Sequence, residues 1–257
     1  MIQIGTCGFS YADWIGPFYP EGTSKADMLG EYAQRFDLLE LNATFYSFLS
    51  QKAVESLLRK AQGGLTFSVK AHRSVTHERN VGNWAPFRES IEPMNASGTL
   101  GCVLVQFPFS FRNTEENREY LSSLNGVASD VPLVAEFRHE SWLADPVLPW
   151  LRTLGLGFCC VDEPQLKGLM PPQSTVTSSL GYVRFHGRNA KKWWNHREAW
   201  ERYDYLYTEE ELAEWVPKIR EMHADAPKVF VLFNNHFGGK AARNAQQLKE
   251  LLEKSDA

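Results

Sequence analysis

Residues 132–138, PLVAEFR, decide the fold prediction, because they form a short apolar strand whose end carries two charges. Successive side chains of a strand point to opposite faces, so Glu136 and Arg138 share one face while the other face stays apolar. The same pattern recurs in residues 182–186, YVRFH, and in residues 66–72, TFSVKAH. Charges at the carboxyl ends of parallel strands are typical of α/β active sites. The pattern predicts where the protein works, but not which reaction it performs.

Strand and helix patterns alternate from one end of the chain to the other. Short hydrophobic runs predict strands at residues 2–7, 38–42, 66–71, 101–107, 133–137, 157–162, 182–186 and 228–233. Apolar spacing and capping residues predict helices that begin at Ser24, Ser50 and Thr208, and further helices within residues 85–96, 114–124, 146–154 and 239–253. Glu211 completes a capping box with Thr208. Residues 72–84 are polar and predict a long loop.

This alternation predicts an α/β fold, namely a single (β/α)8 barrel of the TIM type that spans residues 1–257. Residues 171–179 are polar and contain prolines, so we expect the barrel to be irregular after its sixth strand, with no helix there. The alternative is an open, doubly wound sheet. Neither a glycine-rich dinucleotide fingerprint nor a P-loop follows the first strand.

Composition is that of an ordinary globular protein, with 43% apolar and 23% charged residues. The net charge of −4 argues against nucleic-acid binding by charge alone, although a local basic patch stays open. The N-terminal sequence does not resemble a signal peptide, and no apolar run approaches the ~20 residues of a membrane span. We therefore expect a cytoplasmic protein that does not associate with membranes.

The four cysteines are spaced unlike a metal cluster, and we expect reduced, buried thiols at Cys7, Cys102, Cys159 and Cys160. Cys7 is also considered as a nucleophile, because it ends the first strand.

Every predicted strand carries a polar residue near its carboxyl end, with the parity expected to point into a barrel. The residues expected to point inward are Ile4, Thr6, Leu38, Glu40, Asn42, Ser68, Lys70, His72, Leu104, Gln106, Glu136, Arg138, Cys160, Asp162, Arg184, His186, Leu232 and Asn234. The acidic and basic members nearly cancel, as they must, because unpaired buried charge costs several kcal/mol. The ring is interpreted either as a salt-bridge plug or, preferably, as a site selected for chemistry.

Metal and anion binding lead to different expectations for this ring. Glu40, Glu136, Asp162 and His186 offer metal-ligand atoms, but neighbouring cations would oppose a divalent ion, so no metal or other cofactor is predicted. Phosphate in barrels often lies on the loops after strands 7 and 8. Here those loops carry the candidate anion-binding residues Arg188, Asn234, Asn235 and Lys240.

The predicted loop at residues 187–207 combines aromatic and cationic residues. Such a loop could stack nucleic-acid bases, bind sugars, or fold onto the barrel as a lid. Its members include Arg188, Lys191, Lys192, Trp193, Trp194, Trp200, Tyr203, Tyr205 and Tyr207. The first loop adds the aromatic residues Phe9, Tyr11, Trp14, Phe18 and Tyr19, so we expect aromatic walls on two sides of the mouth.

Several motifs along nearly the whole chain resemble the YecE-like family, the seventy-second family of domains of unknown function. They are Gly5-Thr6-Cys7-Gly8-Phe9, Trp14, Phe18-Tyr19-Pro20, Glu40-Leu41-Asn42, Thr44-Phe45-Tyr46, Phe67-Ser68-Val69-Lys70, Thr76-His77, Gln106-Phe107-Pro108, Glu136-Phe137-Arg138-His139, Ser141-Trp142, Arg184-Phe185-His186-Gly187-Arg188 and Phe233-Asn234-Asn235. The resemblance implies a barrel similar to xylose isomerase and endonuclease IV, but no particular reaction. The histidine-rich metal ligands of endonuclease IV do not map onto this chain. Relatives often carry serine in place of Cys7, which argues against a required thiol nucleophile.

We expect a metal-independent enzyme, a hydrolase, lyase or isomerase, that acts on a small anionic or sugar-phosphate substrate. Glu136 is the candidate general acid or base and His186 the candidate proton shuttle. Glu40 and Asp162 are further catalytic candidates. Candidate substrate-binding residues are Lys70, His72, Arg138, Arg184, Asn42, Gln106, Arg188, Asn234, Asn235, Trp14 and Tyr46. The alternatives are a nucleic-acid-binding or nucleic-acid-processing protein and a non-catalytic ligand-binding module.

Overall fold

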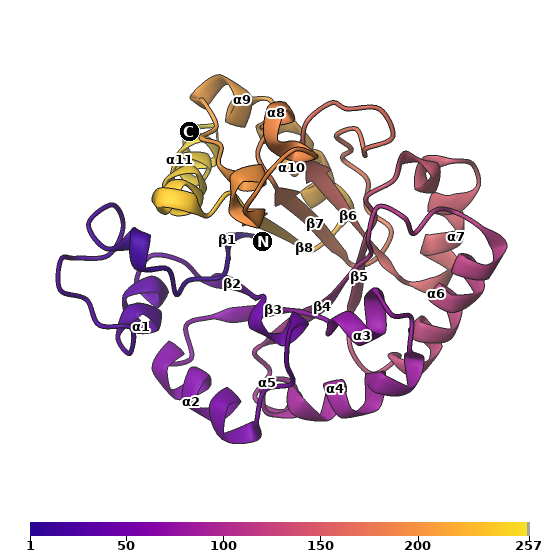
Figure 1. Ribbon diagram of the computed structural model, residues 1–257, viewed down its shortest axis with the longest axis horizontal. Helices are drawn as coiled ribbons and strands as arrows, with labels where there is room; N and C mark the ends of the chain where they lie inside the picture. The colour runs from indigo at the N-terminus through magenta and orange to yellow at the C-terminus, as the bar shows by residue number, and fades with distance from the viewer. Residues whose placement is uncertain (256–257) are drawn as a thin grey trace.

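Eight parallel strands close into a barrel in the computed structural model, which describes residues 1–255 (Figure 1). Each strand pairs with the next one in sequence, and β1 pairs with β8 to complete the ring. The strands are β1 (Ile2–Cys7), β2 (Leu38–Leu41), β3 (Thr66–Lys70), β4 (Leu100–Gln106), β5 (Leu133–Glu136), β6 (Gly157–Asp162), β7 (Leu180–Phe185) and β8 (Lys228–Phe233). The predicted (β/α)8 barrel is confirmed, and the open sheet is excluded.

Helices surround the barrel, as Figure 1 shows for the outer ring that runs from α1 to α7 and on to α11. The α-helices are α1 (Met28–Ala33), α2 (Gln51–Ala61), α3 (Arg73–Thr76), α4 (Trp84–Ser90), α5 (Glu92–Ala96), α6 (Glu115–Val127), α7 (Val147–Leu154), α8 (Ala190–Trp193), α9 (Glu209–Ala213), α10 (Val216–Asp225) and α11 (Lys240–Lys254). The 3-10 helices are η1 (Ala12–Trp14), η2 (Ala43–Phe45), η3 (Val81–Asn83), η4 (Glu140–Leu143), η5 (Ala199–Tyr203) and η6 (Phe237–Gly239).

Side-chain caps begin several helices where the sequence predicted them. The hydroxyl of Ser50 accepts a hydrogen bond from the backbone of α2, and the hydroxyl of Thr114 does the same for α6. Thr208 and Glu211 form both hydrogen bonds of the predicted capping box at α9. Each cap satisfies a backbone N–H that lacks a partner inside its own helix.

Three helix predictions need correction. α1 begins at Met28 rather than next to Ser24, because the Ser24 hydroxyl donates to the Asp27 carboxylate instead of capping the helix backbone. The helix expected within residues 85–96 is two short helices that meet at Ile91. The loop expected at residues 72–84 contains α3 and η3. The absence of a helix after β6 is confirmed, because residues 163–179 lie within the described chain and contain none.

The inward and outward faces of β1 and β6 are opposite to those predicted. Cys7 of β1 reaches the buried Arg184, whereas the Thr6 hydroxyl bonds to Tyr32 of α1. On β6, Cys159 faces Glu136 inside the barrel, and Asp162 faces the helices. Both strands are buried on both faces, so their sequences carry no clear alternation to reveal which face points inward.

None of the helices within residues 1–255 is long and apolar enough to cross a bilayer.

Candidate functional site at the barrel mouth

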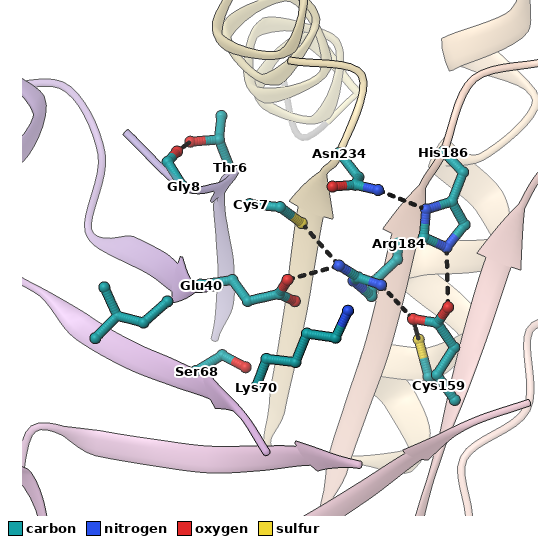
Figure 2. A network of polar contacts seen from close by, with 12 residues as sticks. Thr6, Cys7, Gly8, Glu40, Ser68, Lys70, Cys159, Arg184, His186 and Asn234 are labelled. Atoms are coloured by element: carbon teal, nitrogen blue, oxygen red, sulfur yellow. Dashed lines mark hydrogen bonds and ion pairs between the residues drawn. The ribbon is translucent and has the colours of Figure 1, made fainter. Parts of the chain in front are cut away.

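A buried arginine joins two carboxylates in the upper part of the barrel. Arg184 of β7 donates from Nη2 to Glu40 Oε1 of β2 at 2.6 Å, and from Nη1 to Glu136 Oε2 of β5. Figure 2 shows Arg184 extending toward Glu40 from the opposite side of the barrel. All three side chains are buried. The guanidinium therefore pairs with both buried carboxylates and compensates part of their charge, as such a burial requires.

The network continues on both sides of this bridge. On one side, the Tyr182 hydroxyl donates to Glu40 Oε2 at 2.9 Å and lies 2.6 Å from Ser68 Oγ. On the other side, Glu136 Oε1 lies 2.5 Å from Arg138 Nε and 3.2 Å from His186 Nε2. The last two contacts are close in distance but lack the direction of hydrogen bonds. The result is a continuous layer of polar side chains across the barrel.

Burial and neighbouring charges fix the protonation states of this layer. Burial alone would raise the pKa of Glu136, but Arg138 and Arg184 outweigh it and hold that pKa well below its usual range. Burial, assisted by the positive charge of Arg138, lowers the pKa of His186 to about 3. At neutral pH, Glu136 is therefore a carboxylate and His186 a neutral imidazole. This state opposes Glu136 as a general acid.

Two adjoining cavities lie above the layer, and both open at the barrel mouth. One encloses about 270 Å³ and the other about 240 Å³. We call them the first lobe and the second lobe. Residues shared by both linings are Phe45, Lys70, Arg138 and Tyr203. The first lobe is completed by His77, Gln106, Pro108, Phe109, Leu169, Trp193, Trp194 and Arg202, and the second by Tyr11, Asn42, Tyr46, Arg184, Ala199, Trp200, Asn234 and His236.

Cations line the two lobes, and carboxylates do not. Lys70, Arg138, Arg184 and Arg202 all contribute to the walls, whereas no Asp or Glu of the described residues lines either lobe. Glu40, Glu136 and His186 belong to the layer below and do not line the lobes. The surface that a ligand would meet is therefore positively charged.

Lys70 differs from the other cations of the site. Its Nζ lies 4.3 Å from the centre of the Phe45 ring, and this ammonium group forms no hydrogen bond or ion pair within the described residues 1–255. In Figure 2 its side chain extends toward Arg184, with no dashed line at its end. Burial and then the charge of Arg184 lower the pKa of Lys70 to about 8.

Glu163, which directly follows β6, joins the site from below. It is buried, with Oε2 3.2 Å from Arg138 Nη1 and Oε1 accepting a hydrogen bond from the Met170 backbone at 3.0 Å. Burial raises the pKa of Glu163 to about 7, although Arg138 opposes the increase. Sequence reasoning missed this residue because it assigned the inward position to Asp162.

The loop between β7 and α9 forms a roof over the lobes. It contains α8 and η5, and its Trp193 is buried against the cavity while Tyr203 lines both lobes. The Arg202 guanidinium lies 5.3 Å from the Trp193 ring centre and 5.8 Å from that of Trp194. Of the three interpretations of this loop, the lid is the one that these contacts match. Trp194 remains 52% exposed at the rim.

The structure brings ten of the predicted site residues together at the mouth or directly below it. These are Glu40, Asn42, Tyr46, Lys70, Gln106, Glu136, Arg138, Arg184, His186 and Asn234. Asn234 reaches the layer through its amide, which lies 3.2 Å from His186 Nδ1.

Asp162 and Arg188 bind each other on the outside of the barrel, so the prediction that they join the site is wrong. Asp162 accepts hydrogen bonds from Tyr207, from the Trp215 indole at 2.7 Å and from Arg188. Arg188 also donates to Glu214 at 2.8 Å. These partners come from segments far along the chain, which a strand pattern cannot reveal.

His72, Asn235 and Trp14 also lie outside the lobes, and each has a structural contact instead. The His72 ring accepts from the Ser74 backbone and so caps α3. The Asn235 amide donates to the Tyr205 carbonyl and to Asn244, which ties the loop after β8 to the lid and α11. The Trp14 indole is buried and donates to the His236 carbonyl at 2.7 Å.

The anion site expected before α11 is occupied by the chain's own carboxylates. The backbone N–H of Gly238 donates to Asp13 Oδ2 at 2.6 Å, and Lys240 pairs with Asp204. The positive φ of Gly238 and Gly239 allows this tight turn, which other residues would adopt with strain. The available positive charge lies at the lobes rather than on this loop.

Cys7 does not have the surroundings of a nucleophile. Its thiol is buried beneath Arg184, and burial raises its pKa well above the usual value. Cys102, Cys159 and Cys160 are likewise free and buried.

The candidate metal ligands are not arranged around a common point. Asp162 faces outward, while Arg184 lies between Glu40 and Glu136 and pairs with both. Within residues 1–255 no group of three or more His, Cys, Asp or Glu side chains could hold a metal ion.

A larger cavity of about 430 Å³ lies away from the mouth, beside the start of β1, where the segment between α1 and β2 meets α10 and α11. Its lining mixes Asp37, Lys249 and Glu253 with apolar residues. It lacks the convergence of buried charged groups that marks the mouth, so size alone does not make it the preferred site.

Known proteins match this chain over nearly its full length. A family model described as "Protein of unknown function DUF72" matches residues 3–257. The UPF0759 protein YunF of Bacillus subtilis (strain 168) is 34% identical over 273 residues, which cover 98% of this chain and 95% of that protein.

Two solved structures of similar proteins share the barrel. A DUF72 family protein from Thermotoga maritima MSB8 is 39% identical with a TM-score of 0.90, and the match covers 98% of this chain and 99% of that one. A DUF72 family protein from Enterococcus faecalis V583 is 28% identical with a TM-score of 0.87, and the match covers 98% and 96% of the two chains.

Proposed function

This chain belongs to the DUF72 family of proteins of unknown function, as its resemblance predicted, and we propose that it is a metal-independent enzyme of the cytoplasm. Its substrate is a small anion, such as a sugar phosphate or a carboxylate, which binds in the two lobes at the barrel mouth. The observation that carries this proposal is the charge of the walls, which contain four cations and no carboxylate among the described residues.

The charge of the lobes supports an anion for an energetic reason. The carboxylates of Glu40 and Glu136 form their ion pairs with Arg184 in the layer below, and neither of them forms an ion pair with Lys70 or Arg202. An anion that enters the lobes would pair with these groups inside a partly enclosed cavity. Charge-assisted hydrogen bonds are worth about 1.5–3 kcal/mol each.

The size of the lobes supports a small substrate. Each encloses less than 300 Å³, which is below the usual range for a drug-sized ligand. Gln106 in the first lobe and Asn234 in the second add neutral hydrogen-bonding groups beside the cations. This mixture suits a molecule with one anionic group and several hydroxyl or carbonyl oxygens.

The layer below the lobes gives Glu40, Glu136 and His186 a positioning role. Glu136 contacts both Arg138 and Arg184, and Glu163 contacts Arg138 from the other side. These contacts hold the two guanidinium groups in fixed orientations at the floor of the lobes. Catalytic contact with the substrate falls instead to residues that line the lobes, above all Lys70 and Tyr203.

Ligand binding tests this proposal, and the chain offers a matched pair of variants. Thermal stabilisation by inorganic phosphate and a panel of phosphorylated and carboxylated metabolites is measured first. Arg202→Gln removes a cation from the first lobe, and Arg197→Gln removes an exposed cation of the same loop that lines neither lobe. We expect Arg202→Gln to raise Kd about tenfold, consistent with the loss of about 1.4 kcal/mol, and Arg197→Gln to leave it unchanged.

Two results would count against the proposal. If no anion in the panel stabilises the protein, the lobes are not an anion site. If both variants weaken binding equally, the effect reflects overall charge rather than the lobes. Turnover of stabilising compounds, followed by proton NMR, then separates an enzyme from a binding module.

A further inference from the structure

We propose that Lys70 forms an imine with the carbonyl carbon of an aldehyde, ketone or 2-oxo acid that carries an anionic group. The inference rests on the proposed function, because the lobes must first bind the anionic group. It adds to that function the substrate class and the atom that reacts.

The position of Lys70 supports this role. It ends β3 at the carboxyl side of the barrel and lines both lobes. A carbonyl carbon has two substituents, so a nucleophile at the junction of two cavities can reach the carbon while each lobe holds one substituent. Phe45 and Tyr203 line the same junction and would flank the carbonyl group.

The lack of a carboxylate partner is the second observation. Lys192 pairs with Glu201 at 2.6 Å, and Lys240 pairs with Asp204. Lys70 has no such partner among residues 1–255, although it is largely withdrawn from solvent. The ammonium contacts the Phe45 ring but has no carboxylate partner to offset its burial, and such a partner would hold it in the unreactive ammonium form.

The surrounding charge favours the neutral amine. Burial acts together with the nearby Arg184 to bring the pKa of Lys70 to about 8. With that pKa, about a tenth of the amine is neutral at pH 7, compared with well under a thousandth for an ordinary lysine. Lysines beside other cations in water-poor sites are known to act as nucleophiles for this reason.

The step balances without any further reactant. The ammonium releases one proton, the nitrogen lone pair forms a C–N bond, and the carbonyl π electrons move to oxygen, which takes up that proton. The carbinolamine nitrogen then loses a second proton to the same oxygen, which leaves as water. The nitrogen keeps its third proton, so one ammonium and one carbonyl give one protonated imine and one water.

Reductive trapping with glyoxylate tests the proposal. Glyoxylate is the smallest aldehyde with a carboxylate, so its fit does not depend on the rest of the natural substrate. The full-length protein is treated with limiting glyoxylate and cyanoborohydride, and modified lysines are quantified by peptide mass spectrometry. Exposed Lys52 and Lys60 on α2 are internal controls in the same sample.

We expect Lys70 to be modified at least about tenfold faster than Lys52 at pH 7. A pKa lower by about 2.5 provides roughly 300-fold more neutral amine, and the weaker intrinsic nucleophilicity of a less basic amine offsets part of that gain. The rate at Lys70 should level off above pH 8, whereas the rate at Lys52 continues to rise. Inorganic phosphate should slow the reaction at Lys70 only.

The outcomes separate this inference from the proposed function. If phosphate stabilises the protein but Lys70 reacts no faster than Lys52, the anion site stands and the imine is refuted. If phosphate neither binds nor protects Lys70, the proposed function fails as well. Lys70→Arg keeps the positive charge but removes the primary amine, so the rapid modification should be lost. Rapid modification that persists in this variant at another lysine would also refute the assignment.

Discussion

Replacing Glu136 with Gln should lower the melting temperature by about 10 °C. The substitution keeps the size of the side chain but removes the charge that faces Arg184, Arg138 and His186 in the buried layer. Each of the two guanidinium groups then loses one of its two carboxylate contacts, because Arg184 keeps only Glu40 and Arg138 keeps only Glu163.

The magnitude follows from the cost of breaking a buried ion pair. Removing one partner of such a pair costs about 3–5 kcal/mol, since the other charge stays buried. For a chain of this length, each kcal/mol corresponds to a change of about 2–4 °C in melting temperature. Each arginine keeps a second carboxylate partner, and the substitution relieves the desolvation cost of the buried Glu136 charge, so we take the lower half of this range, about 10 °C.

Thermal unfolding followed by circular dichroism at pH 7 measures the effect, with Glu214→Gln as the control. Glu214 also pairs with an arginine, Arg188, but its side chain is 52% exposed. Exposed ion pairs are worth about 0–1 kcal/mol, so the control should lose no more than about 3 °C. An equally small loss in Glu136→Gln would refute the argument, because it would mean that Glu136 is not a charged member of the buried layer.

Three further predictions follow from the same site. First, the pKa of about 7 for Glu163 lies above its unfolded value of 4.5, so between these two pH values the folded protein binds one proton more than the unfolded chain. The stability that this proton contributes is therefore fully present below pH 4.5 and is lost as the pH rises through 7. The difference in melting temperature between wild type and Glu163→Gln should therefore change across pH 5–8, and a constant difference would contradict the raised pKa. Second, His186 should remain a neutral imidazole from pH 8 down to about pH 4, because its pKa is about 3; nitrogen chemical shifts of the labelled ring report this, and protonation near pH 6.5 would show that the ring is not buried in the layer. Third, Asp162→Asn should destabilise the fold by about 1–3 kcal/mol, because it weakens the contacts to Arg188 and Trp215, yet leave phosphate affinity unchanged. A loss of phosphate-binding free energy much greater than the loss of unfolding free energy would show that Asp162 belongs to the anion site.

Most of the fold was predictable because it depends on local signals. Strand and helix patterns alternated clearly, and caps such as Thr208 with Glu211 marked helix starts. The ends of β3, β5 and β7 could be placed from the alternation of apolar and polar residues, which gave Lys70, Glu136 and Arg184 their correct faces.

The remaining errors have a shared physical origin. β1 and β6 are buried on both faces, so the sequence does not show which residues point inward. Asp162 was placed in the site because it is charged, but its charge is satisfied by Arg188, Tyr207 and Trp215, which only the tertiary fold brings to it. The true inward acid, Glu163, stood one residue further along the chain.

The sequence also could not show that the ring divides into two levels, the buried layer and the lobes above it. Glu40, Glu136 and Lys70 follow the same strand-end pattern, yet two of them lie in the buried layer and one lines the lobes. The depth of each side chain depends on its length and on whether it pairs with Arg184, as Glu40 and Glu136 do. The lid residues Arg202 and Tyr203 lie in an aromatic loop whose path over the barrel has no local signature.

The position of a bound anion tests the central claim most directly. Crystals of the protein grown or soaked with inorganic phosphate would show where the ion settles. We predict phosphate in the lobes, within hydrogen-bond distance of Lys70 and of Arg138 or Arg202. Phosphate ordered elsewhere on the protein while the lobes contain only water, or a metal cation in the lobes, would contradict the account.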